Sequence, residues 1–187
     1  MRIVFMGTPD FAVGSLQALC ESGKHEILAV VTQPDRPKGR GNKLLQTPVK
    51  EYALAQGLTV YQPQKVKTPE FVELLHELQP ELIVVAAFGQ FLSKEILELP
   101  KYGCINVHAS LLPKYRGAAP IQYAIIKGEK ESGVTIMQMD IGMDTGAMLD
   151  KVVVPIEENT TMGELHYALR EQGAALLLQV IDKIAAG

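Results

Sequence analysis

Residues 103–117 are Gly103-Cys-Ile-Asn-Val-His-Ala109 followed by Ser110-Leu-Leu-Pro-Lys-Tyr-Arg-Gly117. The first half is apolar and β-branched and predicts a buried strand, and the second half predicts a loop at its carboxyl end. Asn106 and His108 are two residues apart, so both side chains project from the same face of that strand. Ligands of an open α/β sheet bind beyond the carboxyl ends of its strands. An amide and an imidazole at that edge suit a carbonyl oxygen that gains negative charge.

The rest of the chain alternates apolar strand segments with helical segments. Further strands are predicted at residues 2–6, 25–32, 58–61 and 81–87. Helices are predicted at 11–21, 47–56, 68–79, 93–99, 120–127 and 160–186, with Thr47 and Thr68 at two of the N-termini. Residues 133–139 and 148–156 alternate like the two strands of a hairpin. The pattern predicts an α/β fold: an open, mostly parallel Rossmann-like sheet with helices on both faces and an antiparallel C-terminal extension.

Composition places the chain among soluble globular domains. It has 187 residues, of which 47% are hydrophobic and 21% are charged, and its formal net charge is -3. This balance argues against a wholly basic nucleic-acid-binding protein, although it allows a local basic patch. No apolar run approaches the roughly 20 residues that cross a bilayer, and Gly7-Thr-Pro-Asp10 interrupts the N-terminal apolar segment before it reaches the length of a signal peptide. Cys20 and Cys104 predict free buried thiols, and we expect a cytoplasmic protein without a membrane partner.

The first predicted turn, Gly7-Thr-Pro-Asp-Phe-Ala-Val-Gly14, lacks the glycine spacing of a dinucleotide fingerprint. Pro9 also removes a backbone donor from it, and no phosphate-binding P-loop pattern is present. These features argue against NAD and flavin. Whether the turn only begins a helix or also contacts a ligand stays open. No second histidine or cysteine lies at ligand spacing from His108, so no metal site is expected.

The loop Asp140-Ile-Gly-Met-Asp-Thr-Gly146 holds two acids between glycines, which permit close approach of the backbone to a ligand. Taken alone, Asp144 is as consistent with a turn former as with a catalytic group. Its pairing with Asn106 and His108 favours a catalytic role, because a nearby carboxylate stabilises a protonated imidazole.

A second charged loop follows the strand predicted at 25–32. Its positive residues are Arg36, Lys38, Arg40 and Lys43, against a single acid, Asp35. Most charge runs are solvated surfaces, and that interpretation remains possible here. The position directly after a strand, at the expected ligand edge, favours binding of a polyanion.

The three candidate catalytic residues, Asn106, His108 and Asp144, together with the loop at 110–117, resemble the folate-dependent formyltransferase family. Further matching segments are residues 7–13, 33–41 and 117–122, so the resemblance covers the whole chain. It implies an enzyme that transfers the formyl group of 10-formyltetrahydrofolate, a co-substrate, to the α-amino group of methionyl-initiator tRNA. In that reaction Asn106 and protonated His108 would stabilise the tetrahedral oxyanion, and Asp144 would orient His108 and help to move the proton of the amine. No metal is needed.

The resemblance also assigns binding residues. The loop with Arg36, Lys38, Arg40 and Lys43 would enter the acceptor-stem end of the tRNA. The folate site would comprise Ala86, Phe88, Gly89 and Gln90 on one wall, and Met139, Asp140 and Ile141 on the other. The signature loop contains Ser110, Leu111, Leu112, Pro113, Arg116 and Gly117.

Domain organisation and alternatives follow from the same resemblance. We expect residues 1–187 to form the catalytic domain, as a monomer, without the smaller C-terminal β-barrel domain of the resembled enzymes. Two alternatives stay open: formyl transfer to a sugar-nucleotide or glycinamide ribonucleotide amine, and a non-catalytic nucleotide-binding module. The basic loop favours the tRNA acceptor over the first, and the three site residues argue against the second.

Overall fold

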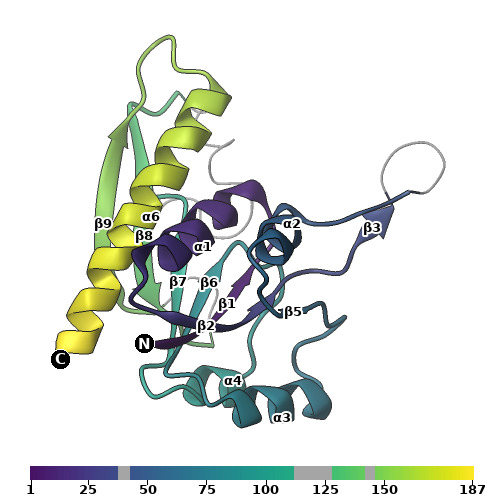
Figure 1. The fold of residues 1–187 in the computed structure, drawn as a ribbon. Helices are drawn as coiled ribbons and strands as arrows, with labels where there is room; N and C mark the ends of the chain where they lie inside the picture. The colour runs from purple at the N-terminus through teal and green to yellow at the C-terminus, as the bar shows by residue number, and fades with distance from the viewer. Residues whose placement is uncertain (38–42, 112–127, 142–145) are drawn as a thin grey trace.

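The computed structural model describes residues 1–37, 43–111, 128–141 and 146–187 (Figure 1). Its main sheet has seven strands in the order β5-β2-β1-β6-β7-β8-β9. Their bounds are β1 Arg2–Gly7, β2 Glu26–Val31, β5 Val60–Tyr61, β6 Leu82–Ala86, β7 Cys104–His108, β8 Glu131–Gln138 and β9 Met148–Pro155. The five strands from β5 to β7 in this order pair in parallel, whereas β8 is antiparallel to both β7 and β9. This confirms the predicted Rossmann-like sheet and its antiparallel extension.

Helices cover both faces of the sheet, as predicted (Figure 1). One face packs against α1 Asp10–Ser22, α2 Pro48–Ala55 and α6 Met162–Ala186, and the other packs against α3 Pro69–Leu78 and α4 Lys94–Glu98. Because strand residues alternate, Phe5 and Ile105 belong to the first core while Met6 and Cys104 belong to the second. The alternation defines which core each functional side chain faces.

Threonine side chains cap the N-termini of α2, α3 and α6. Thr47 and Thr68, both predicted, accept hydrogen bonds from backbone N–H groups at 3.1 and 3.4 Å. The final helix begins at Met162, two residues later than predicted, because Thr161 forms a capping box with Glu164. The helix predicted at 120–127 lies outside the described residues.

The loop predicted over residues 33–46 contains short strands that the sequence analysis missed. β3 (Arg36–Pro37) pairs with β4 (Leu44–Leu45) in an antiparallel ladder. Two-residue strands are too short to show a hydrophobic period, so no pattern predicted them. We call residues 36–45 the arm; Figure 1 shows its strand β3 extending away from the body of the domain.

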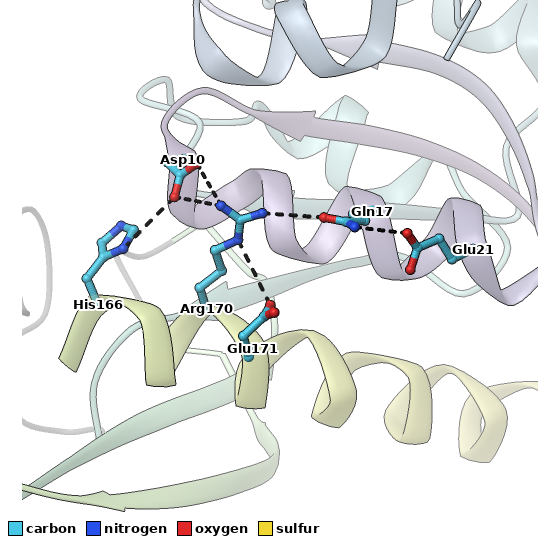
Figure 2. A network of polar contacts seen from close by, with 6 residues as sticks. All are labelled: Asp10, Gln17, Glu21, His166, Arg170 and Glu171. Carbon is cyan, nitrogen blue, oxygen red and sulfur yellow. Dashed lines mark hydrogen bonds and ion pairs between the residues drawn. The ribbon is translucent and has the colours of Figure 1, made fainter. Parts of the chain in front are cut away.

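A polar network joins the first helix to the last (Figure 2). Arg170 of α6 places one guanidinium nitrogen 2.7 Å from each carboxylate oxygen of Asp10, at the start of α1. The Arg170 stem crosses Gly14, where an added Cβ would lie 2.4 Å from Arg170 Cγ. His166 Nδ1 lies 4.0 Å from Asp10, and Gln17 accepts from Arg170 at 3.4 Å. These contacts hold α6 against the helix that follows β1.

The two cysteines are free, as predicted. Cys104 is buried, and burial raises the pKa of its thiol to about 12, which keeps it protonated and unreactive. Cys20 is only partly buried, in contrast to the prediction, because it lies on the rim of the core near the end of α1. Within the part of the chain that the structure describes, no helix is long and apolar enough to cross a membrane.

Candidate active site

The sheet changes winding direction between β1 and β6, and their carboxyl ends lie side by side there. Gly7 ends β1, and a Cβ added to it would lie 2.8 Å from Ala86 O and 2.7 Å from Ala12 Cβ. The next residue, Thr8, donates from its hydroxyl to Phe88 O at 2.8 Å. The turn after β1 is therefore bonded directly to the turn after β6, at the position where open α/β sheets bind ligands.

Asn106 lies in the middle of a row of cross-strand neighbours. Its partner on β6 is Val85 and its partner on β8 is Met137, and these side chains are 5% and 2% exposed. Asn106 itself is partly exposed. A carboxamide between two buried apolar side chains forms stronger hydrogen bonds than one in water, because the local dielectric is low.

His108 follows on the same face of β7, as predicted. Ile105 and Val107, the alternating residues, both belong to the core under α1 and α6. His108 is 7% exposed, pairs with Thr135 across the sheet, and places Nδ1 2.8 Å from Ser110 Oγ. The imidazole is thereby held at the end of β7.

Ser110 is in turn held by β8. The Thr135 hydroxyl donates to Ser110 O at 2.6 Å, and both side chains are fully buried. The following residue, Leu111, packs over Gly133, where an added Cβ would lie 2.6 Å from Leu111 Cδ2. The beginning of the signature loop is therefore packed onto β8, and this brings the loop beside His108.

The candidate folate residues lie at two different levels along β7. The Met139 N–H donates to Cys104 O at 2.9 Å, so the segment after β8 begins beside the start of β7. Residues 87–90 follow the opposite end of β6, because Val85 pairs with Asn106. Strands rise about 3.3 Å per residue, so the candidate site extends along β7 with Asn106 between its two walls.

The candidate folate side chains differ in exposure. Ala86 and Phe88 are buried, with Phe88 2% exposed in the core under α3 and α4, so only their backbone atoms can face a ligand. Ile141, by contrast, is 70% exposed. Ala87 and Gly89 have φ angles of 50° and 96°, in the left-handed region that costs a residue such as alanine on the order of 1 kcal/mol. Strained backbone of this kind clusters at functional sites.

Several predicted site residues lie outside the described residues. They are Asp144, Lys38, Arg40, Leu112, Pro113, Arg116 and Gly117. Among the described residues, no group of three or more His, Cys, Asp or Glu side chains could hold a metal ion.

Thr135, Lys50 and Gln62 make contacts that the sequence does not predict. Thr135 supports Ser110, while Lys50 and Gln62 bond to Asp35 across 15 and 27 residues of sequence. Separations of this kind carry no periodic signal. The sequence indicates only that Thr135 lies on a strand with alternating side chains, and the structure places it opposite His108.

The comparisons with known proteins agree with this geometry. Residues 1–181 match the family model described as formyl transferase. The chain belongs to the formyl transferase family. It is 58% identical, over its whole length, to a methionyl-tRNA formyltransferase of Clostridium botulinum and 59% identical to one of Caldanaerobacter subterraneus. The chain spans 60% of the length of each of these curated relatives.

Solved structures of other formyltransferases share the fold. A phosphoribosylglycinamide formyltransferase of Bacillus halodurans superposes with a TM-score of 0.79 at 25% identity, covering 98% of this chain and 95% of that one. A sugar N-formyltransferase of Shewanella superposes with a TM-score of 0.72 at 24% identity, covering 98% of this chain and 69% of that one. Formyltransferases with different names therefore share this sheet, so the acceptor must be argued from features other than the fold.

Proposed function

We propose that this chain catalyses formyl transfer from 10-formyltetrahydrofolate to the α-amino group of methionyl-initiator tRNA. The observation that carries the proposal is the placement of Asn106 and His108 on one face of β7, at the ligand edge of a formyl transferase fold. The relatives named methionyl-tRNA formyltransferase support the choice of acceptor.

In the proposed mechanism, the amine nitrogen attacks the formyl carbon and forms a C–N bond, and the carbonyl oxygen becomes an oxyanion. The Asn106 amide and protonated His108 donate hydrogen bonds to that oxygen as its charge develops. Since Nδ1 of His108 bonds with Ser110, we assign Nε2 to the oxyanion. The C–N10 bond to the folate then breaks, the amine loses a proton, and the folate nitrogen gains one.

Asp144 is proposed to stabilise protonated His108 through its negative charge and to help move the proton of the amine, while the two imidazole nitrogens bond to Ser110 and the oxyanion. The donor would bind across β7, between the backbone of residues 87–90 and the segment from Met139 to Ile141. Carbonyl and N–H groups of strained turns offer hydrogen bonds at the edge of such a pocket, and apolar side chains line its sides. We further propose that the protein acts in the cytoplasm as a monomer.

The choice of acceptor is tested by measuring tetrahydrofolate release with three amines. Methionyl-initiator tRNA, glycinamide ribonucleotide and an amino-sugar nucleotide are supplied separately at the same donor concentration. We expect the highest kcat/KM with the tRNA. A higher kcat/KM with either small acceptor would refute the proposed acceptor, and absence of release with all three would refute the enzymatic function.

The arm is proposed to bind tRNA phosphates. Replacement of Arg36, Lys38, Arg40 and Lys43 by alanine should flatten the salt dependence of tRNA binding, because fewer counterions are released, by roughly 0.7–0.9 in logarithmic slope per lost phosphate contact. Donor affinity should stay unchanged, since the donor site lies elsewhere. The matched control removes four exposed lysines outside the arm: Lys24, Lys94, Lys101 and Lys183. Equal slopes for the arm variant and the wild-type chain would contradict the prediction.

A further inference from the structure

The residues that flank the arm, which we call its base, make buried and partly buried contacts, whereas the described residues of the arm are exposed. Leu44 and Leu45 of β4 are 64% and 48% exposed. At the base, the hydroxyls of Thr32 and Thr47 lie 2.7 Å apart, and Thr32 is fully buried. Because the arm is exposed, the contacts at its base determine the direction in which it leaves the domain.

Asp35 is the acidic residue of the otherwise basic loop, and its carboxylate is held at this base. Lys50 Nζ donates to one oxygen at 2.9 Å, and Gln62 Nε2 donates to the other at 2.7 Å. The hydrogen bond from Lys50, followed by the one from Gln62, lowers the pKa of Asp35. Lys50 also neutralises the carboxylate, so Asp35 anchors the arm without cancelling its positive charge.

The anchor continues to the turn that follows β6 through two glutamines. Gln62 Nε2 lies 3.2 Å from Gln33 O, and Gln33 Oε1 accepts from Gln90 Nε2 at 2.9 Å. The glutamine contact is close because Gly89 has no side chain: an added Cβ would lie 2.7 Å from Gln33 Nε2. The φ of 96° at this glycine also disfavours any other residue.

The carboxamide of Gln90 bonds to three residues in two other loops. Besides Gln33, its Nε2 donates to Pro63 O at 3.2 Å, and its Oε1 accepts from the Val66 N–H at 2.9 Å. One side chain thereby joins the loops that follow β2, β5 and β6. Both of its N–H groups and its oxygen are engaged within the protein, so the carboxamide serves the protein's own loops.

We infer that Gln90 is a positioning residue for the tRNA acceptor: it holds the base of the arm at a set position relative to the turn 87–90. The inference rests on the proposed function. The geometric reason is the continuous chain of hydrogen bonds from Gln90 through Gln33 and Gln62 to Asp35. Loss of the carboxamide removes the hydrogen bonds to the loops after β2 and β5. The base of the arm then has no fixed position, so the arm contacts the tRNA in many orientations.

The test compares Gln90→Leu, which keeps the size of the side chain, with Gln56→Leu at the exposed end of α2. We expect Gln90→Leu to raise the KM for methionyl-tRNA about 5–10-fold, the effect of about 1–1.4 kcal/mol of lost hydrogen bonding. The kcat should change less than 3-fold, on the order of the scatter among neutral surface variants. Gln56→Leu should leave both constants unchanged. An unchanged KM in Gln90→Leu, or a fall in kcat alone, would overturn the inference.

A double-mutant cycle tests the chain of bonds itself. Asp35→Asn and Gln90→Leu should be non-additive in the KM for tRNA, because each loosens the same base. Amide hydrogen exchange of residues 33–37 and 43–47 provides a readout that needs no tRNA, and both variants should accelerate it. Additive effects, or exchange at the wild-type rate in Gln90→Leu, would refute the inference.

Two observations keep this test separate from the proposed function. If the wild-type chain transfers no formyl group to tRNA, the proposed function fails, and hydrogen exchange alone then decides whether Gln90 positions the arm. If Gln90→Leu does not fold, Gln33→Ala removes the contact between the two glutamines alone and should give the same faster exchange. Wild-type exchange in that variant would refute the inference.

Discussion

Formyl transfer by a His108→Ala variant should be about 10²–10³-fold slower than by the wild-type chain, because the proposed mechanism loses one donor to the oxyanion. The loss should appear in kcat, since the hydrogen bond forms as charge develops in the transition state. Asn106→Ala should have an effect of similar size. The double variant should lose less than the product of the two, because both residues are proposed to act on the same oxygen.

The control for this prediction is His76→Ala on α3, where the imidazole side chain is 56% exposed and lies far from β7 in sequence. It should retain wild-type turnover. His108 is buried, so circular dichroism and urea unfolding should establish that the His108→Ala variant is folded before its rate is interpreted. Near-normal turnover in folded His108→Ala and Asn106→Ala variants would refute the proposed catalytic roles.

Substitution of Gly7 by alanine should destabilise the fold strongly. Its Cβ would meet Ala86 O at 2.8 Å and Ala12 Cβ at 2.7 Å, and neither can move without shifting a strand or a helix. Overpacking of this kind costs about 1–3 kcal/mol, and the backbone contact favours the upper end. The free energy of unfolding, measured with urea, should fall by that amount.

Gly163→Ala provides the matched control for the same substitution. Gly163 lies in the first turn of α6, where an added Cβ has open space except for Thr161 Oγ1 at 4.0 Å. Alanine is the better helix former by up to about 1 kcal/mol, so this variant should be as stable as the wild-type chain or more stable. A Gly7→Ala variant as stable as Gly163→Ala would contradict the close packing between β1 and β6.

The local features of the fold and of the candidate site could be predicted from the sequence. Asn106 and His108 share a face because side chains alternate on a strand, and this needs only their spacing of two. Thr47 and Thr68 stand directly before Pro48 and Pro69, which signals a capped helix start without any tertiary information. Local rules of this kind hold because the interacting groups are close in the chain.

The environment of the site could not be predicted in the same way. The sequence predicts Phe88 and Gln90 in the folate site by their position, whereas in the structure the Phe88 ring packs in the core and the Gln90 carboxamide bonds to the loops after β2 and β5. We therefore propose that the backbone of residues 87–90, and not these two side chains, contacts the donor. A residue's place in a loop says little about which way its side chain packs.

By itself, the sequence determined the alternation of strands and helices, the shared face of Asn106 and His108, and the basic charge of the arm. Periodicity, capping and charge are properties of neighbouring residues, so they can be inferred from the chain alone. Only the tertiary structure decided that Ser110 and Thr135 support His108, and that Asp35, Gln33 and Gln90 join the arm to the turn after β6. These contacts link residues up to 57 positions apart, and only the folded sheet brings their strand ends together.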